Sequence, residues 1–171
     1  DSIRKFVNEN NSINAKVTVS TSKVVLSSIG VAVGLAMIAF SIYSIVQIVD
    51  KYNPDFVRKD ACGAWIIREL YNDRTSSFGW EVDHIYPESK LQSMDVPQDK
   101  IDDLINLRPL NWRNNDSKGA DYPHYQSKLK AGSIKDENGQ DHDINVKGED
   151  EKEINYDIQQ QIIELFKGYS L

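Results

Sequence analysis

The chain of 171 residues is long enough for one modest domain with an anchor or tail, and too short for two full domains. Its net charge of −6 arises in the last quarter: residues 131–171 hold 4 basic and 10 acidic side chains, against 11 and 12 in residues 58–130. This charge disfavours a free, processive DNA binder, which normally presents a basic face to phosphates. The single cysteine, Cys62, excludes an intrachain disulfide and a zinc site built from several cysteines.

Residues 1–22 are rich in Asn, Ser and Lys and are expected to form an N-terminal arm. The next segment contains no charged residue from Val24 to Val49, a run of 26 residues. A helix needs about 20 mostly apolar residues to cross a bilayer. The run therefore predicts one transmembrane helix over residues 23–50 and a single-pass membrane location, with neither the membrane nor the orientation decided. The alternative is a buried helix of a soluble domain, although such helices nearly always carry a polar stripe.

Two glycines within this apolar run, Gly30 and Gly34, form a GxxxG pattern. Small residues at this spacing allow two membrane helices to approach closely. The expected partners of the segment are therefore the lipid bilayer and, through the Gly30/Gly34 face, other membrane subunits.

Two short strands and a short helix are predicted downstream, in residues 78–90 and 102–119. In the first piece Trp80, Val82 and Ile85 indicate a strand that presents Asp83 and His84 at its end. Pro87 then ends the strand. In the second piece residues 106–112 predict another short strand or an extended turn, and residues 113–119 predict a helix that ends at a glycine.

This arrangement can bring Asp83, His84 and Asn115 together. Asp and Asn oxygens are ligands that suit a hard divalent cation such as Mg²⁺, which also binds phosphate oxygens. A neighbouring imidazole can take a proton from water near neutral pH. Asn114 is the alternative ligand if the helix is rotated. These groups are the minimum equipment for phosphodiester hydrolysis.

The same segment resembles the HNH (ββα-metal) endonuclease family. Asp83-His84 match its first element, Asn106-Leu107 its second and Asn115 its third, with Lys118 at a position where a basic residue is common. The resemblance covers about 60 residues, from Cys62 to roughly Pro123. It implies that Asp83 and Asn115 bind a divalent cation such as Mg²⁺. It further implies that His84 is the general base and that Asn106 orients the His84 loop by hydrogen bonding.

The sequence departs from the family pattern after the first strand, where Ser89-Lys90-Leu91-Gln92 replaces the usual paired glycines. The HNH-like domain is expected to span residues 51–130, followed by an acidic C-terminal segment over residues 131–171. Within that segment, residues 133–150 are interpreted as a polar loop with a hairpin turn at Asn138-Gly139. Residues 151–168 are predicted to form an amphipathic terminal helix. The predicted class is α+β: one transmembrane helix, a ββα-metal domain and a C-terminal helix.

The leading functional hypothesis is a membrane-anchored, metal-dependent HNH endonuclease that hydrolyses phosphodiester bonds of DNA. The alternative is an accessory structural subunit of a membrane complex, which retains an HNH-like fold without nuclease activity. A third hypothesis is a nuclease toxin whose apolar stretch assists translocation. The preserved Asp83, His84 and Asn115 favour the enzyme.

Overall fold

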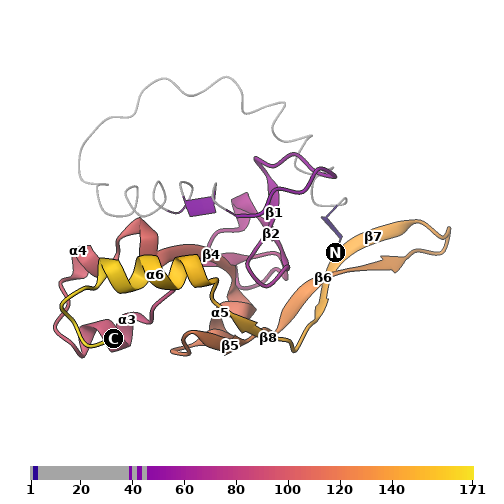
Figure 1. Ribbon diagram of the computed structural model, residues 1–171. Coiled ribbons are helices and arrows are strands. Elements are labelled where there is room, and N and C mark those ends of the chain that lie inside the picture. Colours follow the sequence, from indigo (N-terminus) through magenta and orange to yellow (C-terminus); the bar gives the residue numbers. More distant parts are fainter. Residues whose placement is uncertain (1, 4–38, 40–41, 44–45) are drawn as a thin grey trace, which may run out of the picture.

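The computed structural model describes residues 2–3, 39, 42–43 and 46–171 (Figure 1). This part of the chain is α+β. Its strands are β1 (Val57–Lys59), β2 (Trp65–Ile67), β3 (Trp80–His84), β4 (Leu107–Asn111), β5 (His124–Gln126), β6 (Leu129–Lys135), β7 (Asp141–Lys147) and β8 (Glu151–Glu153). Its helices are α3 (Glu88–Gln92), α4 (Gln98–Ile101), α5 (Trp112–Lys118) and α6 (Tyr156–Leu165), with 3₁₀ turns η1 (Arg68–Leu70) and η2 (Leu104–Asn106).

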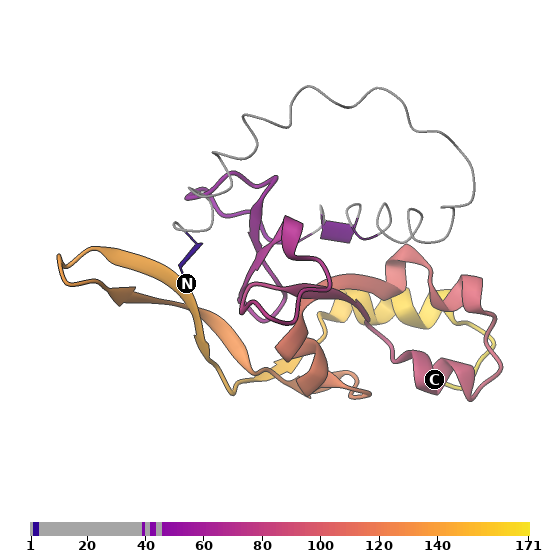
Figure 2. The same ribbon diagram turned by 180° about the vertical axis from the view of Figure 1, so that it is seen from behind.

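The described strands pair in four antiparallel two-stranded sheets: β1–β2, β3–β4, β5–β8 and β6–β7. The β6–β7 hairpin projects from the rest of the molecule in both views (Figures 1 and 2). The β5–β8 sheet joins residues 124–126 to residues 151–153, so it ties the acidic C-terminal segment to the preceding domain.

The centre of the fold is the β3–β4 hairpin followed directly by α5. Both strands and the helix form where the sequence predicted them. The side chain of Asn111 accepts a hydrogen bond from the Arg113 amide and so caps the N-terminus of α5. Gly119 follows the last helical residue with φ +50°, a conformation that glycine adopts readily. Gly79 precedes β3, and a β-carbon there would lie 1.7 Å from the Asp73 carbonyl oxygen.

Among the residues that the structure describes, three groups of buried apolar side chains surround this centre. The largest lies between the hairpin and helices α3, α4 and α6, and contains Ile85, Leu110, Ile162 and Phe166 among others. A second group joins β1 and β2 to Phe78. Because α6 contributes to the same core as β3 and β4, the acidic C-terminal segment completes the domain.

The prediction of a membrane-spanning helix over residues 23–50, and with it of a single-pass membrane location, is wrong. No helix in the described ranges is long and apolar enough to cross a membrane. Most of the predicted helix, with Gly30 and Gly34, lies outside the described residues. Its C-terminal end is not helical, because Gln47 forms an antiparallel bridge with Lys59.

Tyr43 gives the physical reason for this correction. Its ring packs against Trp80 with 5.2 Å between centroids, and its hydroxyl donates to the carbonyl oxygens of Phe56 and Ile66. Ala39 and Ile42 are also buried. Apolar side chains gain as much by leaving water for a protein core as for a bilayer, and hydropathy does not distinguish the two.

The C-terminal third differs from its prediction in two respects. Residues 133–150, interpreted as a loop, contain most of the β6–β7 hairpin. The turn predicted at Asn138-Gly139 is confirmed, since the Gly139 amide donates to the Asp136 carbonyl and Gly139 has φ +74°. The terminal helix is confirmed over Tyr156–Leu165 and is shorter than predicted, because residues 151–153 form β8.

Candidate active site

Asp83 and His84 occupy the last two positions of β3, opposite Arg108 and Leu107 of β4. Successive side chains of a strand point to opposite faces. The adjacent side chains of Asp83 and His84 therefore lie on opposite faces of β3. The backbone at this end is held by Asn106, whose carbonyl accepts from the Ile85 amide at 2.7 Å. The hairpin therefore presents both candidate residues next to the start of the loop that follows.

Asp83 is buried and forms two ion pairs. One carboxylate oxygen accepts from Arg108 Nε at 2.8 Å, and the other lies 2.9 Å from Lys118 Nζ. Lys118 is 1% exposed and also donates to the His84 carbonyl oxygen. Burial lowers the pKa of the Lys118 ammonium from its ordinary value, although the Asp83 carboxylate opposes this shift. Each Asp83 oxygen is thus already in contact with a cation.

His84 lies at the surface end of the same strand. Its Nε2 is 2.8 Å from a carboxylate oxygen of Asp102, and its Nδ1 is 3.9 Å from Glu88. A carboxylate beside Nε2 favours the tautomer that carries its proton there, so Nδ1 is left as the basic nitrogen. Asp102 also accepts from Gln98, which holds the carboxylate in place. The arrangement is a histidine oriented by an acid, with one ring nitrogen available to accept a proton.

Asn106 is fully buried, and its side chain hydrogen-bonds to backbone groups. Its side-chain oxygen accepts from the Tyr86 amide at 2.8 Å, and its amide nitrogen donates to the Tyr86 and Ile101 carbonyls. These three bonds connect the segment after His84 to the end of α4. In this position Asn106 supports the backbone beside His84 and is shielded from any substrate.

Asn115 projects from the middle of α5 toward β3. Its amide nitrogen donates to Glu81 at 3.0 Å, and Glu81 in turn pairs with Arg74. The neighbouring Asn114, the alternative ligand, points into the core and makes four hydrogen bonds, to Asp60, Lys128 and both backbone groups of Leu129. Since an amide side chain has two donor hydrogens and two acceptor lone pairs, Asn114 has no capacity left for a metal.

A pocket of about 370 Å³ is lined by Asp83, His84, Glu88 and Asn115 together with neighbouring residues. The Asp83 carboxylate and the Asn115 amide oxygen are suitable donors for Mg²⁺, which fills its remaining positions with water. Two observations oppose tight binding: Asp83 is already neutralised, and no three His, Cys, Asp or Glu side chains converge within the part of the chain that the structure describes. The residues therefore fit an ion that keeps most of its water, and not one enclosed by protein.

Comparisons with protein-family models, with curated proteins and with solved structures found no match to this chain.

Three polar residues of this region were missed by sequence reasoning. Glu81 lies two positions before Asp83 and so shares its face of β3, a relation that the period-two alternation of a strand could have revealed. Asp102 and Arg108 have no such signal, because they reach His84 and Asp83 through the fold from 18 and 25 positions away.

Proposed function

We propose that this protein is a magnesium-dependent endonuclease of the HNH (ββα-metal) type, which hydrolyses phosphodiester bonds of DNA. One observation carries the proposal: a single compact unit, the β3–β4 hairpin with α5, brings Asp83, His84 and Asn115 to the same pocket. The order of the elements and the residue types at their ends both agree with this class.

Each side chain of the candidate site has its own role in the proposed hydrolysis. His84 accepts the proton of the attacking water at Nδ1, while Asp102 holds the opposite nitrogen. Asp83 and Asn115 are the residues that would hold the magnesium ion, which when bound would supply a positive charge to stabilise the phosphate and the leaving oxygen. Asn106 keeps the backbone beside His84 in place.

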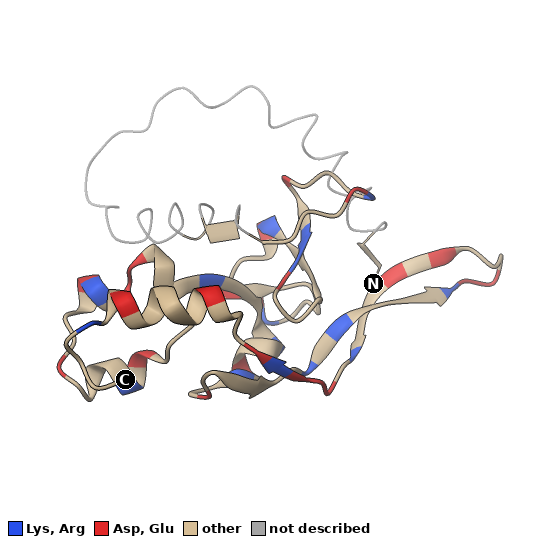
Figure 3. Cartoon of the chain, viewed as in Figure 1, with Lys and Arg blue, Asp and Glu red and all other residues tan. Residues whose placement is uncertain are grey.

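Charge around the site favours local contacts with phosphate over a long track on DNA. Figure 3 shows acidic and basic residues interspersed over the elements. Arg74 and Arg113 lie over the Trp112 ring at the start of α5, 5.7 and 4.8 Å from its centroid. Arg74 already pairs with Glu81 and Asp116, so we assign the phosphate contact at this end of α5 to Arg113.

The experiment is a plasmid-nicking assay with the purified full-length chain in Mg²⁺. We expect His84→Ala to lower the cleavage rate about 10²–10⁴-fold, because the general base is lost. Circular dichroism should show an unchanged fold, since His84 is partly exposed and does not support the core. The matched control is His124→Ala, which removes an exposed histidine of β5 and should cleave like the wild type.

The second candidate function is a structural module without nuclease activity. It is favoured by the ion pairs of Asp83, which already compensate the carboxylate on both oxygens. If the wild-type chain fails to cleave in either Mg²⁺ or Mn²⁺ and cannot be distinguished from His84→Ala, the endonuclease proposal is refuted and the structural module replaces it.

A further inference from the structure

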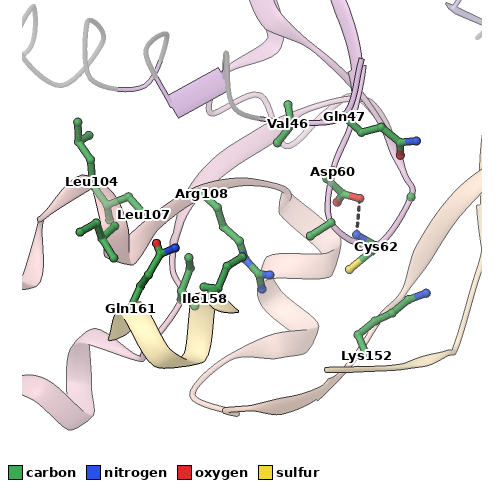
Figure 4. Close-up of a pocket in the computed structure, with 14 residues that line it drawn as sticks. Val46, Gln47, Asp60, Cys62, Leu104, Leu107, Arg108, Lys152, Ile158 and Gln161 are labelled. Carbon is green, nitrogen blue, oxygen red and sulfur yellow. Dashed lines mark hydrogen bonds between the residues drawn. The ribbon is translucent and has the colours of Figure 1, made fainter. Parts of the chain in front are cut away.

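A second pocket, of about 830 Å³, lies on a different part of the molecule (Figure 4). Its walls come from α6, η2, β4, the residue that follows β3 and the loop before β2, and they are mostly apolar. The apolar side chains include Ile85, Leu104, Ile105, Leu107 and Ile158. Its size is that of a pocket for a small molecule, for which roughly 300–1,000 Å³ is usual.

One charged group lies within these apolar walls. Arg108 lines the pocket, and Figure 4 shows its guanidinium group between Ile158 and Cys62. The residue is 9% exposed, and its Nη2 is buried without a hydrogen-bond partner among the described residues. A buried donor that lacks a partner costs about 1–3 kcal/mol, and more when the group is charged. An acceptor that approaches the guanidinium group from the pocket would reduce this cost.

The charges around Arg108 indicate which acceptor fits. Arg108 and Lys118 both contact the single carboxylate of Asp83. These three side chains together therefore carry one excess positive charge. Lys152 also lines the pocket and is partly exposed. Asp60 also lines the pocket, and its carboxylate already accepts from the Cys62 and Ala64 amides and from Asn111 and Asn114. A ligand with one negative charge matches this balance better than a doubly charged phosphate.

We propose that this pocket binds a small apolar carboxylic acid, with its carboxylate on the guanidinium group of Arg108 and its apolar body against Ile85, Leu107 and Ile158. Leu104 and Ile105 are 58% and 43% exposed, and they form the apolar rim at which such a ligand enters. This pocket shares no lining residue with the pocket of the candidate active site, although Arg108 pairs with Asp83 behind it, and the proposal does not depend on nuclease activity.

The test uses the full-length chain and decanoate. Decanol, which has an alkyl chain of the same length and no charge, is the comparison ligand. Calorimetric titration should give binding of one decanoate per chain, and decanol should bind at least about tenfold more weakly, because a charge-assisted hydrogen bond contributes roughly 1.5–3 kcal/mol. The Arg108 Nε–H resonance should shift in ¹⁵N spectra on addition of decanoate. An absence of decanoate binding, or equal affinity for the two probes, would overturn the proposal.

Arg108→Lys tests the residue itself, since lysine keeps a positive charge for Asp83 and removes Nη2. We expect its affinity for decanoate to fall about tenfold, while Arg113→Lys, at an exposed arginine of α5, keeps the wild-type value. If Arg108→Lys does not fold, Leu104→Asp serves instead, because it places a negative charge at the exposed rim and should repel the acid. Wild-type affinity in whichever of these two variants folds refutes the assignment.

Discussion

Asp102 and His84 meet across 2.8 Å although 18 positions separate them in the chain. The contact depends on α4, whose last residue, Ile101, is fully buried and places Asp102 beside the end of β3. His84 thereby has a fixed ring orientation in the absence of substrate. A single substitution at Asp102 tests this orientation directly.

Asp102→Asn should lower kcat for DNA cleavage by about tenfold or more and leave KM nearly unchanged, because the amide can support the wrong tautomer of the imidazole. Asp102→Glu should restore part of the rate, since it retains the acceptor. The measurement is steady-state cleavage, with melting temperature as the check on folding. A variant that changes KM alone would show that Asp102 binds substrate and does not position His84.

Asp60 shows how much of the site's support rests on one buried side chain. Its carboxylate accepts from the Cys62, Ala64 and Asn111 amides and from the Asn114 side chain. It therefore joins the loop before β2 to the start of α5. Burial raises the pKa of this carboxyl, while the four hydrogen bonds act in the opposite direction.

At the scale of elements, α6 has one face in the core and one in solvent. Ile162 is fully buried, whereas its neighbour Ile163 is 53% exposed. The sequence pattern placed both on the apolar side of the helix, and the structure separates them by the 100° that one residue turns. The pair provides a matched comparison of burial within one helix.

Ile162→Ala should destabilise the protein by about 2–5 kcal/mol, because it removes buried methyl groups and leaves a cavity. Ile163→Ala, the control, should stay within about 0.5 kcal/mol of the wild type. Urea unfolding followed by circular dichroism measures both. Equal effects of the two substitutions would contradict the packing of α6 against α3, α4 and the hairpin.

At the scale of the whole molecule, the pKa of the Cys62 thiol differs between the folded and the unfolded chain. Its thiol lies in the core beside the Tyr125 hydroxyl, and burial together with the Asp60 carboxylate raises the pKa of the thiol to about 12. An exposed thiol in the unfolded chain ionises near about pH 8.5. The folded chain therefore holds a proton that the unfolded chain releases between these two values.

Because the folded-state pKa is the higher one, the contribution of Cys62 to stability is complete below about pH 8.5 and declines as the pH rises toward 12. Within this window the loss is up to about 1.4 kcal/mol per pH unit. We expect the free energy of unfolding to fall more steeply from pH 8 to pH 10 in the wild type than in Cys62→Ala, measured by urea titration. Parallel slopes for the two proteins would show that the thiol titrates alike in both states.

The local elements of the site could be predicted from the sequence alone. Alternating apolar residues and Pro87 delimit β3, and Gly119 ends α5, because these signals act through the backbone of a few adjacent residues. The Asn138-Gly139 turn is determined in the same way, since glycine adopts a positive φ without a steric cost. Spacing along the chain also placed Asp83, His84 and Asn115 near one another.

Tertiary structure alone decided which groups these residues meet. Asp83 pairs with Arg108 and Lys118, and His84 with Asp102, through contacts that no local pattern encodes. The end of the apolar segment was decided in the same way, since Tyr43 packs on Trp80 and not in lipid. Hydropathy measures the gain on leaving water, and it does not specify the surface that receives the side chain. That surface exists only after distant strands and helices have packed.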